Sequence, residues 1–125
     1  MKLAVVGSRN FDNYPVLKAK LDILHKHKDI TCIISGGANG ADSLAERWAR
    51  ENRIELLIFL PEWDKYGKSA GYIRNVDIIK ASDAVIAFWD GKSKGTQHDI
   101  NLAKEHNKPL AIIFFNETIS HDIKI

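Results

Sequence analysis

Several residue types and patterns that would assign this sequence to a class are missing from it. Cys32 is its one cysteine, which excludes an internal disulfide and a zinc site built from cysteines. No stretch reaches the roughly 18 apolar residues of a membrane-spanning helix, and the short apolar start of the chain is followed at once by glycine and charge. We therefore expect an unprocessed, cytoplasmic protein with no membrane association.

An excess of one charge is also missing. Eighteen Lys and Arg residues stand against sixteen Asp and Glu residues, so the formal net charge is only +2. With 125 residues, 45% of them hydrophobic and 27% charged, the chain lies in the ordinary range for one globular domain with one core. This balance argues against a disordered tail and against a polycation.

Signatures of metal or serine chemistry are absent as well. The five histidines show no spacing typical of metal ligands, and no GxSxG turn accompanies the serines. We predict no metal and no cofactor.

What the sequence does have is a regular alternation of apolar runs and helical patterns. Continuous apolar runs at 2–6, 30–35, 55–60, 84–88 and 109–115 are typical of strands buried on both faces of a parallel sheet. Apolar residues at helical spacing lie between them, around 17–24, 41–49, 73–81 and 100–106. The order predicts a three-layer α/β fold over residues 1–115 with a mainly parallel five-stranded sheet.

The last ten residues do not fit this alternation. We expect 116–125 to be a C-terminal tail or an extra edge element, in which Ile119, Ile123 and Ile125 contribute to a possible homo-oligomer.

All eight glycines lie in the four loops that follow the first four predicted strands. The carboxyl ends of parallel strands meet at one edge of the sheet, where α/β folds bind ligands. Glycine lets a ligand approach main-chain N–H groups, and a helix that follows adds N–H donors for an anion. We predict that loops 36–40 and 91–96 each hold a phosphate at this edge.

The charge along this edge is mixed, with six basic and five acidic residues. Such a mixture suits a small ligand with one or two phosphates better than a nucleic-acid backbone, so we do not expect nucleic acid as a partner. Arg9 and Arg74 adjoin the glycine loops and are candidates for bidentate phosphate contacts. Trp63, Tyr66 and Trp89 are candidates for stacking on a base, whereas Trp48 lies on an apolar helical stripe and is expected in the core.

The glycine-loop motifs resemble a known family. Gly7-Ser8-Arg9, the run 36–42, Pro61-x-Trp63, Arg74-Asn75 and the run 88–96 resemble the YspA/YpsA-like branch of the SLOG superfamily. The resemblance implies a Rossmann-like domain that binds a nucleotide or a nucleotide-derived ligand. The resemblance and the glycine-rich loops together predict a set of ligand-binding residues. They are Gly7, Ser8, Arg9, Gly36, Gly37, Ala38, Gly40, Asp42, Trp63, Arg74, Asn75, Asp90, Gly91, Ser93, Gly95 and Thr96.

A more distant resemblance, to the LOG phosphoribohydrolases, raises a catalytic alternative. Arg74 occupies the position of their signature arginine, and Gly95-Thr96-x-x-Asp99 stands where GTxxE would be, although the preceding PGG run is replaced and Asp99 is one methylene shorter. Cleavage of an N-glycosidic bond builds positive charge on the ribose, which a carboxylate such as Asp99 stabilises. In the alternative interpretation, Asp99 only complements the dipole of the first turn of a helix.

Three functions therefore stay open. The leading hypothesis is a protein that binds a nucleotide-derived small molecule as a sensor, sequestering or processing protein. The first alternative is a LOG-like enzyme that uses Arg74 and Asp99, and whether the protein is an enzyme is left open. The second alternative, by analogy with DprA, is single-stranded DNA binding, for which a more basic rim with several stacking aromatic residues would be expected.

Overall fold

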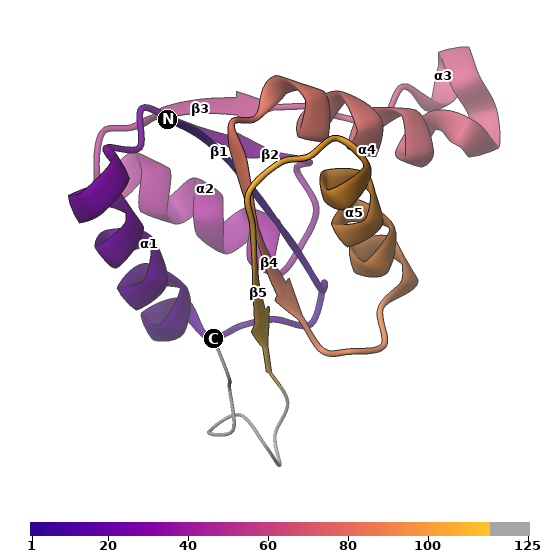
Figure 1. The fold of residues 1–125 in the computed structure, drawn as a ribbon. Coiled ribbons are helices and arrows are strands. Elements are labelled where there is room, and N and C mark those ends of the chain that lie inside the picture. Colours follow the sequence, from indigo (N-terminus) through magenta and orange to yellow (C-terminus); the bar gives the residue numbers. More distant parts are fainter. Residues whose placement is uncertain (116–125) are drawn as a thin grey trace.

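Five strands form one sheet in the order β3-β2-β1-β4-β5, and every pair of neighbours is parallel (Figure 1). The computed structural model describes residues 1–115. The strands are β1 (Lys2–Gly7), β2 (Cys32–Ser35), β3 (Glu55–Ile58), β4 (Ala84–Trp89) and β5 (Leu110–Phe114). The predicted α/β class is confirmed, with a sheet that is parallel throughout.

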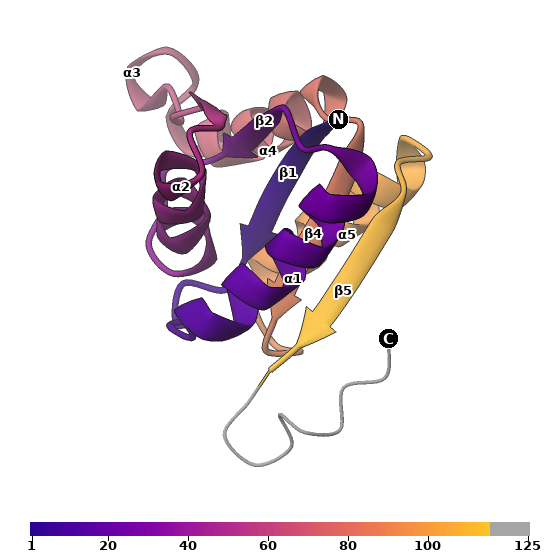
Figure 2. The same cartoon turned by 90° about the vertical axis from the view of Figure 1, so that its left-hand side faces the viewer.

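Helices connect the strands and cover both faces of the sheet. They are α1 (Tyr14–Lys28), α2 (Ala41–Glu51), α3 (Trp63–Tyr66), the 3-10 helix η1 (Gly67–Ser69), α4 (Ala70–Ala81) and α5 (Lys94–Glu105). α1 and α2 lie on one face, and α4 and α5 lie on the other (Figure 2). Of the described helices, none combines the length and the apolar character needed to cross a membrane.

Alternate residues of β1 show why the strand runs are continuously apolar. Leu3 and Val5 pack in the cluster under α1 and α2, whereas Ala4 and Val6 pack in the cluster under α4 and α5. Trp48 is fully buried in the first cluster, as predicted, and its Nε1 donates to Asp22 at 2.9 Å. Both faces of β1 are thus part of the core.

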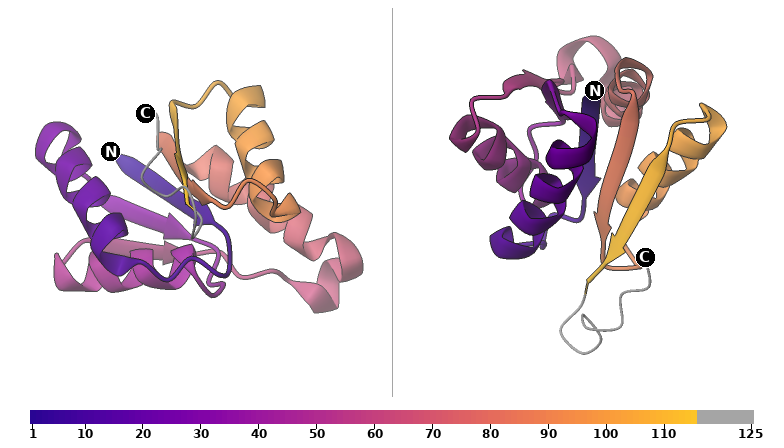
Figure 3. Two further views of the ribbon diagram at one scale, coloured as in Figure 1. Left: turned by 90° about the horizontal axis from the view of Figure 1, so that it is seen from below. Right: turned by 60° about the vertical axis from the view of Figure 1, so that its left-hand side comes forward.

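Local signals explain most element boundaries. Asn13 caps α1, because its Oδ1 accepts from the Val16 N–H at 3.2 Å, and Pro15 occupies the first turn. α4 and α5 begin several residues before their apolar stripes, in turns that contain Gly71 and Gly95. The segment after the third predicted strand, expected to be a loop, instead contains α3 and η1, and α3 projects away from the sheet (Figure 3).

The topology places a crevice at the carboxyl edge. From β1 the chain proceeds to β2 and β3 on one side, and then returns to β4 and β5 on the other. Connections that diverge in this way leave space between the loops after β1 and β4, where α/β sheets bind ligands. The predicted tail 116–125 and its three isoleucines lie outside the described residues.

Candidate functional site

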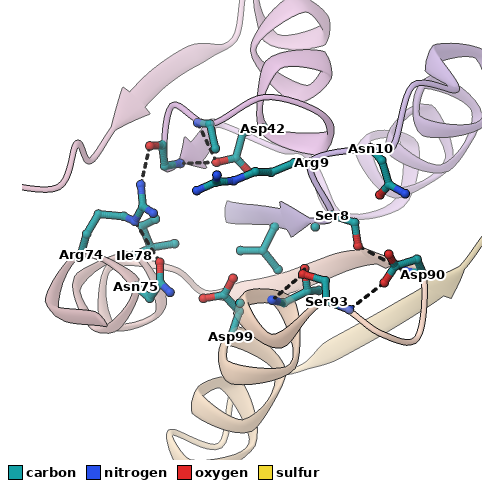
Figure 4. Close-up of a pocket in the computed structure, with 16 residues that line it drawn as sticks. Ser8, Arg9, Asn10, Asp42, Arg74, Asn75, Ile78, Asp90, Ser93 and Asp99 are labelled. Atoms are coloured by element: carbon teal, nitrogen blue, oxygen red, sulfur yellow. Dashed lines mark hydrogen bonds between the residues drawn. The ribbon is translucent and has the colours of Figure 1, made fainter. Parts of the chain in front are cut away.

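A pocket of about 470 Å³ opens at this crevice (Figure 4). It brings together loops after β1, β2 and β4, one side of α4 and the first two turns of α5. The residues that line it are Val6, Gly7, Ser8, Arg9, Asn10, Gly36, Ala38, Asp42, Arg74, Asn75, Ile78, Asp90, Ser93, Gly95, Thr96 and Asp99.

The loop after β1 is fixed by close packing against two other segments. The Ser8 N–H donates to the Phe88 carbonyl at 2.9 Å, and the Ser8 carbonyl accepts from Phe11 at 3.2 Å. A Cβ added to Gly40 would lie 2.3 Å from the Ser8 carbonyl oxygen, and one added to Gly7 would lie 2.5 Å from the Phe88 oxygen. Gly7 and Gly40 are therefore required by packing between backbone segments.

The loop between β2 and α2 uses its N–H groups internally. Asp42 Oδ2 accepts from Gly36 at 3.1 Å and from Ala38 at 3.2 Å, while Ser35 Oγ accepts from Gly37 at 3.1 Å. These three donors are not free for a phosphate in this structure. The first three N–H groups of the predicted phosphate loop 36–40 are therefore already occupied.

The loop between β4 and α5 is organised by two side chains. Asp90 Oδ1 accepts from the N–H groups of Lys92 at 2.9 Å and Ser93 at 2.8 Å, and Ser93 Oγ caps α5 by accepting from Thr96 at 3.4 Å. Apart from its chain neighbours and the backbone of α5 itself, no atom of residues 1–115 lies within 4 Å of a Cβ added to Gly95. The first turn of α5 thus faces the pocket with open space in front of it.

Arg74 is held by two acceptors. Its Nη1 donates to the Gly36 carbonyl at 2.6 Å, and its Nε donates to Asn75 Oδ1 at 2.9 Å. Arg9 contrasts with it, because Arg9 is exposed at the pocket rim and takes part in no ion pair among residues 1–115. Figure 4 shows the Arg9 side chain reaching over the pocket. The site therefore combines one fixed and one free guanidinium.

Asp99 is the most unusual carboxyl of the pocket. It is 9% exposed, points into the pocket (Figure 4), and lies in the second turn of α5. Burial, and next the negative charge of Asp42, raise its pKa to about 7 against the opposing effect of Arg74. The alternative interpretation of Asp99 as a first-turn complement to the helix dipole is wrong, because α5 begins at Lys94 and its first turn holds no acidic residue.

The other two carboxyls of the pocket differ from Asp99 in their hydrogen bonds. Burial raises the pKa of Asp42, although the N–H of Ala38, the charge of Arg74 and the N–H of Gly36 oppose it. For Asp90, burial acts upward but the N–H groups of Ser93 and Lys92 prevail, so its pKa is lowered. Both are occupied in holding loops, which leaves Asp99 available to a ligand.

Four predicted ligand-binding residues lie outside the pocket lining. Gly37, Gly40 and Gly91 take positive φ values in the loops behind it, and Trp63 lies on α3 with 59% of its surface exposed. Among the other stacking candidates, Trp89 packs against Phe114 and donates from Nε1 to the Ser93 carbonyl at 3.1 Å.

Three lining residues were missed by the sequence analysis: Val6, Asn10 and Ile78. Val6 and Ile78 belong to apolar patterns that indicate core, and only the polar character of loop 7–11 could have suggested Asn10. Within residues 1–115, no group of three or more His, Cys, Asp or Glu side chains is arranged to hold a metal ion.

Comparisons with known proteins agree with this architecture. The model of the YspA, cpYpsA-related SLOG family matches residues 1–66. The Gene 61 protein of Mycobacterium phage D29 is 35% identical over 116 residues, which cover 87% of this chain and 93% of the phage protein.

Two solved structures share the fold. DNA processing protein A (DprA) from Streptococcus pneumoniae superposes with a TM-score of 0.73 at 21% identity, over 95% of this chain and 52% of that one. DprA from Helicobacter pylori, described for its single-stranded DNA binding mode, gives a TM-score of 0.72 at 21% identity, over 94% of this chain and 67% of that one. The chain thus spans about half the length of the S. pneumoniae protein.

These neighbours correct one expectation. The mixed charge of the rim led us to expect no nucleic-acid partner, and that exclusion is wrong, because the fold is shared with a DNA processing protein that binds single-stranded DNA. Nucleic acid is therefore retained as a candidate partner.

Proposed function

This chain belongs to the YspA, cpYpsA-related SLOG family, and from that premise we propose that it binds a nucleotide or a nucleotide-derived small molecule in the pocket at the carboxyl edge of its sheet. The observation that carries the proposal is the pairing, in one pocket of about 470 Å³, of an open helix N-terminus with the carboxyl of Asp99, which has no hydrogen-bond partner among residues 1–115. Pockets of a few hundred Å³ are typical of small-molecule sites.

We place the phosphate at the N-terminus of α5. The N–H groups of the first helical residues have no partner within the helix, and the Ser93 cap uses only that of Thr96. Lys94 and Gly95 then offer donors to an anion, with the favourable end of the helix dipole behind them. Arg9 is free to close over the same group from the rim.

Asp99 and Arg74 would then face the sugar or base. Asp99 lies on the pocket wall, and no hydrogen bond within residues 1–115 contributes to its pKa, so its carboxyl is available to a ligand hydroxyl or amino group. With a pKa of about 7, the same carboxyl can also donate a hydrogen bond when protonated.

The test compares two glycines in equivalent helix positions. Gly95 is the second residue of α5 and Gly71 the second residue of α4, and neither has a contact closer than 3.8 Å at an added Cβ. Gly95→Asp puts a negative charge at the proposed phosphate site, and we expect AMP affinity, measured by calorimetry, to fall by at least about tenfold. Gly71→Asp, outside the pocket, should bind AMP like the wild type.

Equal AMP affinity in both variants would contradict the phosphate placement. Failure of a panel of nucleoside 5′-monophosphates to bind the wild type, together with no copurifying small molecule by mass spectrometry, would contradict the proposed function itself.

A catalytic version of this function is favoured by the position of Asp99, which is buried in the pocket wall, where burial raises its pKa. A carboxyl with a pKa of about 7 can act as a general acid toward a leaving base or, when ionised, stabilise positive charge on a ribose. In a LOG-like enzyme, incubation with nucleoside monophosphates should release free base. Asp99→Asn should abolish that release while leaving AMP binding largely intact, and unchanged release in this variant would contradict the role of Asp99.

Single-stranded DNA is the second candidate, and the two DprA neighbours favour it. Arg9, Lys92 and Lys94 are exposed around the pocket and are the cations that a phosphodiester backbone would meet. DNA binding predicts an affinity for oligonucleotides that falls steeply with salt in fluorescence anisotropy. Loss of that binding in Gly95→Asp but not in Gly71→Asp would assign the strand to this pocket.

A further inference from the structure

His98, just outside the pocket lining, carries an unexplained polar atom. Its ring stacks on Tyr72 of α4, with centroids 4.4 Å apart and planes at 27°. Its Nε2 is buried and meets no hydrogen-bond partner among residues 1–115. A buried polar atom without a partner lowers stability, so a phenylalanine would satisfy this packing position better than histidine does.

The other ring nitrogen connects His98 to the pocket. Arg74 Nε donates to an atom of the Asn75 amide at 2.9 Å, and since arginine has only donors, that atom must be the amide oxygen. The amide nitrogen of Asn75 therefore faces His98 Nδ1, 3.4 Å away, and donates to it. This orientation requires Nδ1 to be the acceptor, so the proton of neutral His98 resides on Nε2.

The resulting chain of hydrogen bonds ends at Arg74. His98 Nδ1 fixes which way the Asn75 amide points, and that amide presents its oxygen to Arg74 Nε. The Gly36 carbonyl holds Nη1 at 2.6 Å on the other side. With both positions occupied, the plane of the guanidinium is set, and its remaining N–H groups are left for the pocket.

We propose that His98 is a positioning residue that holds Arg74, through Asn75, in the orientation that receives the ligand. The part that concerns ligand affinity rests on the function proposed above, whereas the part that concerns the orientation of Arg74 applies to the free protein.

Two substitutions separate this role from packing. His98→Phe keeps the ring stacked on Tyr72 and removes both the acceptor and the unpartnered Nε2. We expect stability at least equal to that of the wild type but AMP affinity about tenfold weaker, as for the loss of one hydrogen bond. His98→Asn does the reverse, because its Oδ1 can replace Nδ1 as acceptor while the stacking is lost. We expect lower thermal stability with AMP affinity close to that of the wild type.

Matched controls use the same assays. His106→Phe makes the same exchange at the end of α5, away from the pocket lining, and should leave AMP affinity unchanged. In an Asn75→Ala background, adding His98→Phe should cause no further loss, because the connection is already broken. A further tenfold loss there, or AMP affinity that follows stability across the His98 variants, would overturn the proposal.

A measurement without ligand separates this proposal from the proposed function. The Nε–Hε resonance of Arg74 and the side-chain amide resonances of Asn75 should shift in His98→Phe and return toward the wild-type positions in His98→Asn. Unchanged resonances in His98→Phe would overturn the positioning role even if AMP binds, whereas shifted resonances in a protein that does not bind AMP would support it while the proposed function fails.

Discussion

The two glycine loops that precede α2 and α5 share a sequence pattern and differ in physical state. Before α2, the three N–H groups of Gly36, Gly37 and Ala38 all meet side-chain oxygens, and Gly40 is pressed against the Ser8 carbonyl. Before α5, an added Cβ at Gly91 or Gly95 would meet nothing within 4 Å among residues 1–115 beyond its own neighbouring backbone. The first loop is filled by its own protein, and the second is open to the pocket.

The aspartates that follow the two loops show the same difference. Asp42 accepts two hydrogen bonds from the loop before it, so its carboxylate works as a clamp on the backbone. Asp99 lies equally deep, with 9% exposure against 8%, and no hydrogen bond contributes to its pKa. Glycine-rich sequence before a helix therefore indicates either close packing or ligand access, and the space in front of its glycines distinguishes the two.

Among the substitutions that test this difference between the loops, the largest loss of stability is expected at Gly40. Its φ of 76° and ψ of −128° suit glycine alone, and an added Cβ would lie 2.3 Å from a backbone oxygen that cannot move without β1 and its loop. We expect Gly40→Ala to lower the free energy of unfolding on the order of 4 kcal/mol, measured by urea denaturation.

Gly95→Ala is the matched control for the open loop. Gly95 has no positive φ and lies in the first turn of a helix, where alanine is preferred by about 1 kcal/mol or less. We expect stability equal to or slightly above the wild type. Similar losses in both variants would contradict the distinction between a filled and an open loop.

The sequence predicted the fold and the edge of the sheet that carries the site, for reasons visible in particular residues. Runs such as Leu3 to Val6 can be apolar at every position only if both faces are covered, and that implies a parallel sheet with helices on both sides. Topology then brings the loops after β1, β2 and β4 together, whatever their detailed conformation.

The sequence could not predict which donors stay free. The capture of Gly36 and Ala38 by Asp42 depends on a loop geometry that no periodicity encodes. α3 has only four residues, too few for a helical pattern, so the exposed position of Trp63 away from the pocket was not foreseen. The contact between Asn75 and His98 joins residues 23 apart on two helices, and only the packing of α4 on α5 creates it.

The second expected effect concerns the unpaired carboxyl and depends on pH. Folding raises the pKa of Asp99 from 3.8 to about 7, so between these values the folded state binds more protons than the unfolded state. Stability therefore decreases as pH rises from about 4 through about 7, by an amount on the order of 3 kcal/mol. Asp99→Asn cannot ionise, and urea denaturation should show it gaining that amount over the wild type above pH 7, with little difference near pH 4.

Asp90 is expected to make stability change with pH in the opposite direction. Its pKa is lowered, because the N–H groups of Ser93 and Lys92 outweigh the effect of its burial. Asp90→Asn should lose stability relative to the wild type at neutral pH and approach it as the wild-type carboxyl is protonated in acid.

An Asp99→Asn variant whose stability follows that of the wild type at every pH would contradict the prediction for Asp99.

The smallest expected effect concerns the charge of Asp42, which follows the loop before α2, and its influence on the pKa of Asp99 in α5. The negative charge of Asp42 is the second cause, after burial, of the raised pKa of Asp99. Asp42→Asn keeps an oxygen that can accept from the Gly36 and Ala38 N–H groups but removes that charge. We therefore expect the pKa of Asp99, followed by carboxyl carbon NMR, to fall below 7 and to stay above 3.8, because burial remains.

Asp90→Asn is the control, because it removes one charge from the same pocket lining but Asp90 does not contribute to the pKa of Asp99. The titration of Asp99 should be unchanged in this variant. Equal shifts in the two variants would mean that Asp99 responds to the net charge of the pocket, and the coupling between the two loops would then not run through Asp42.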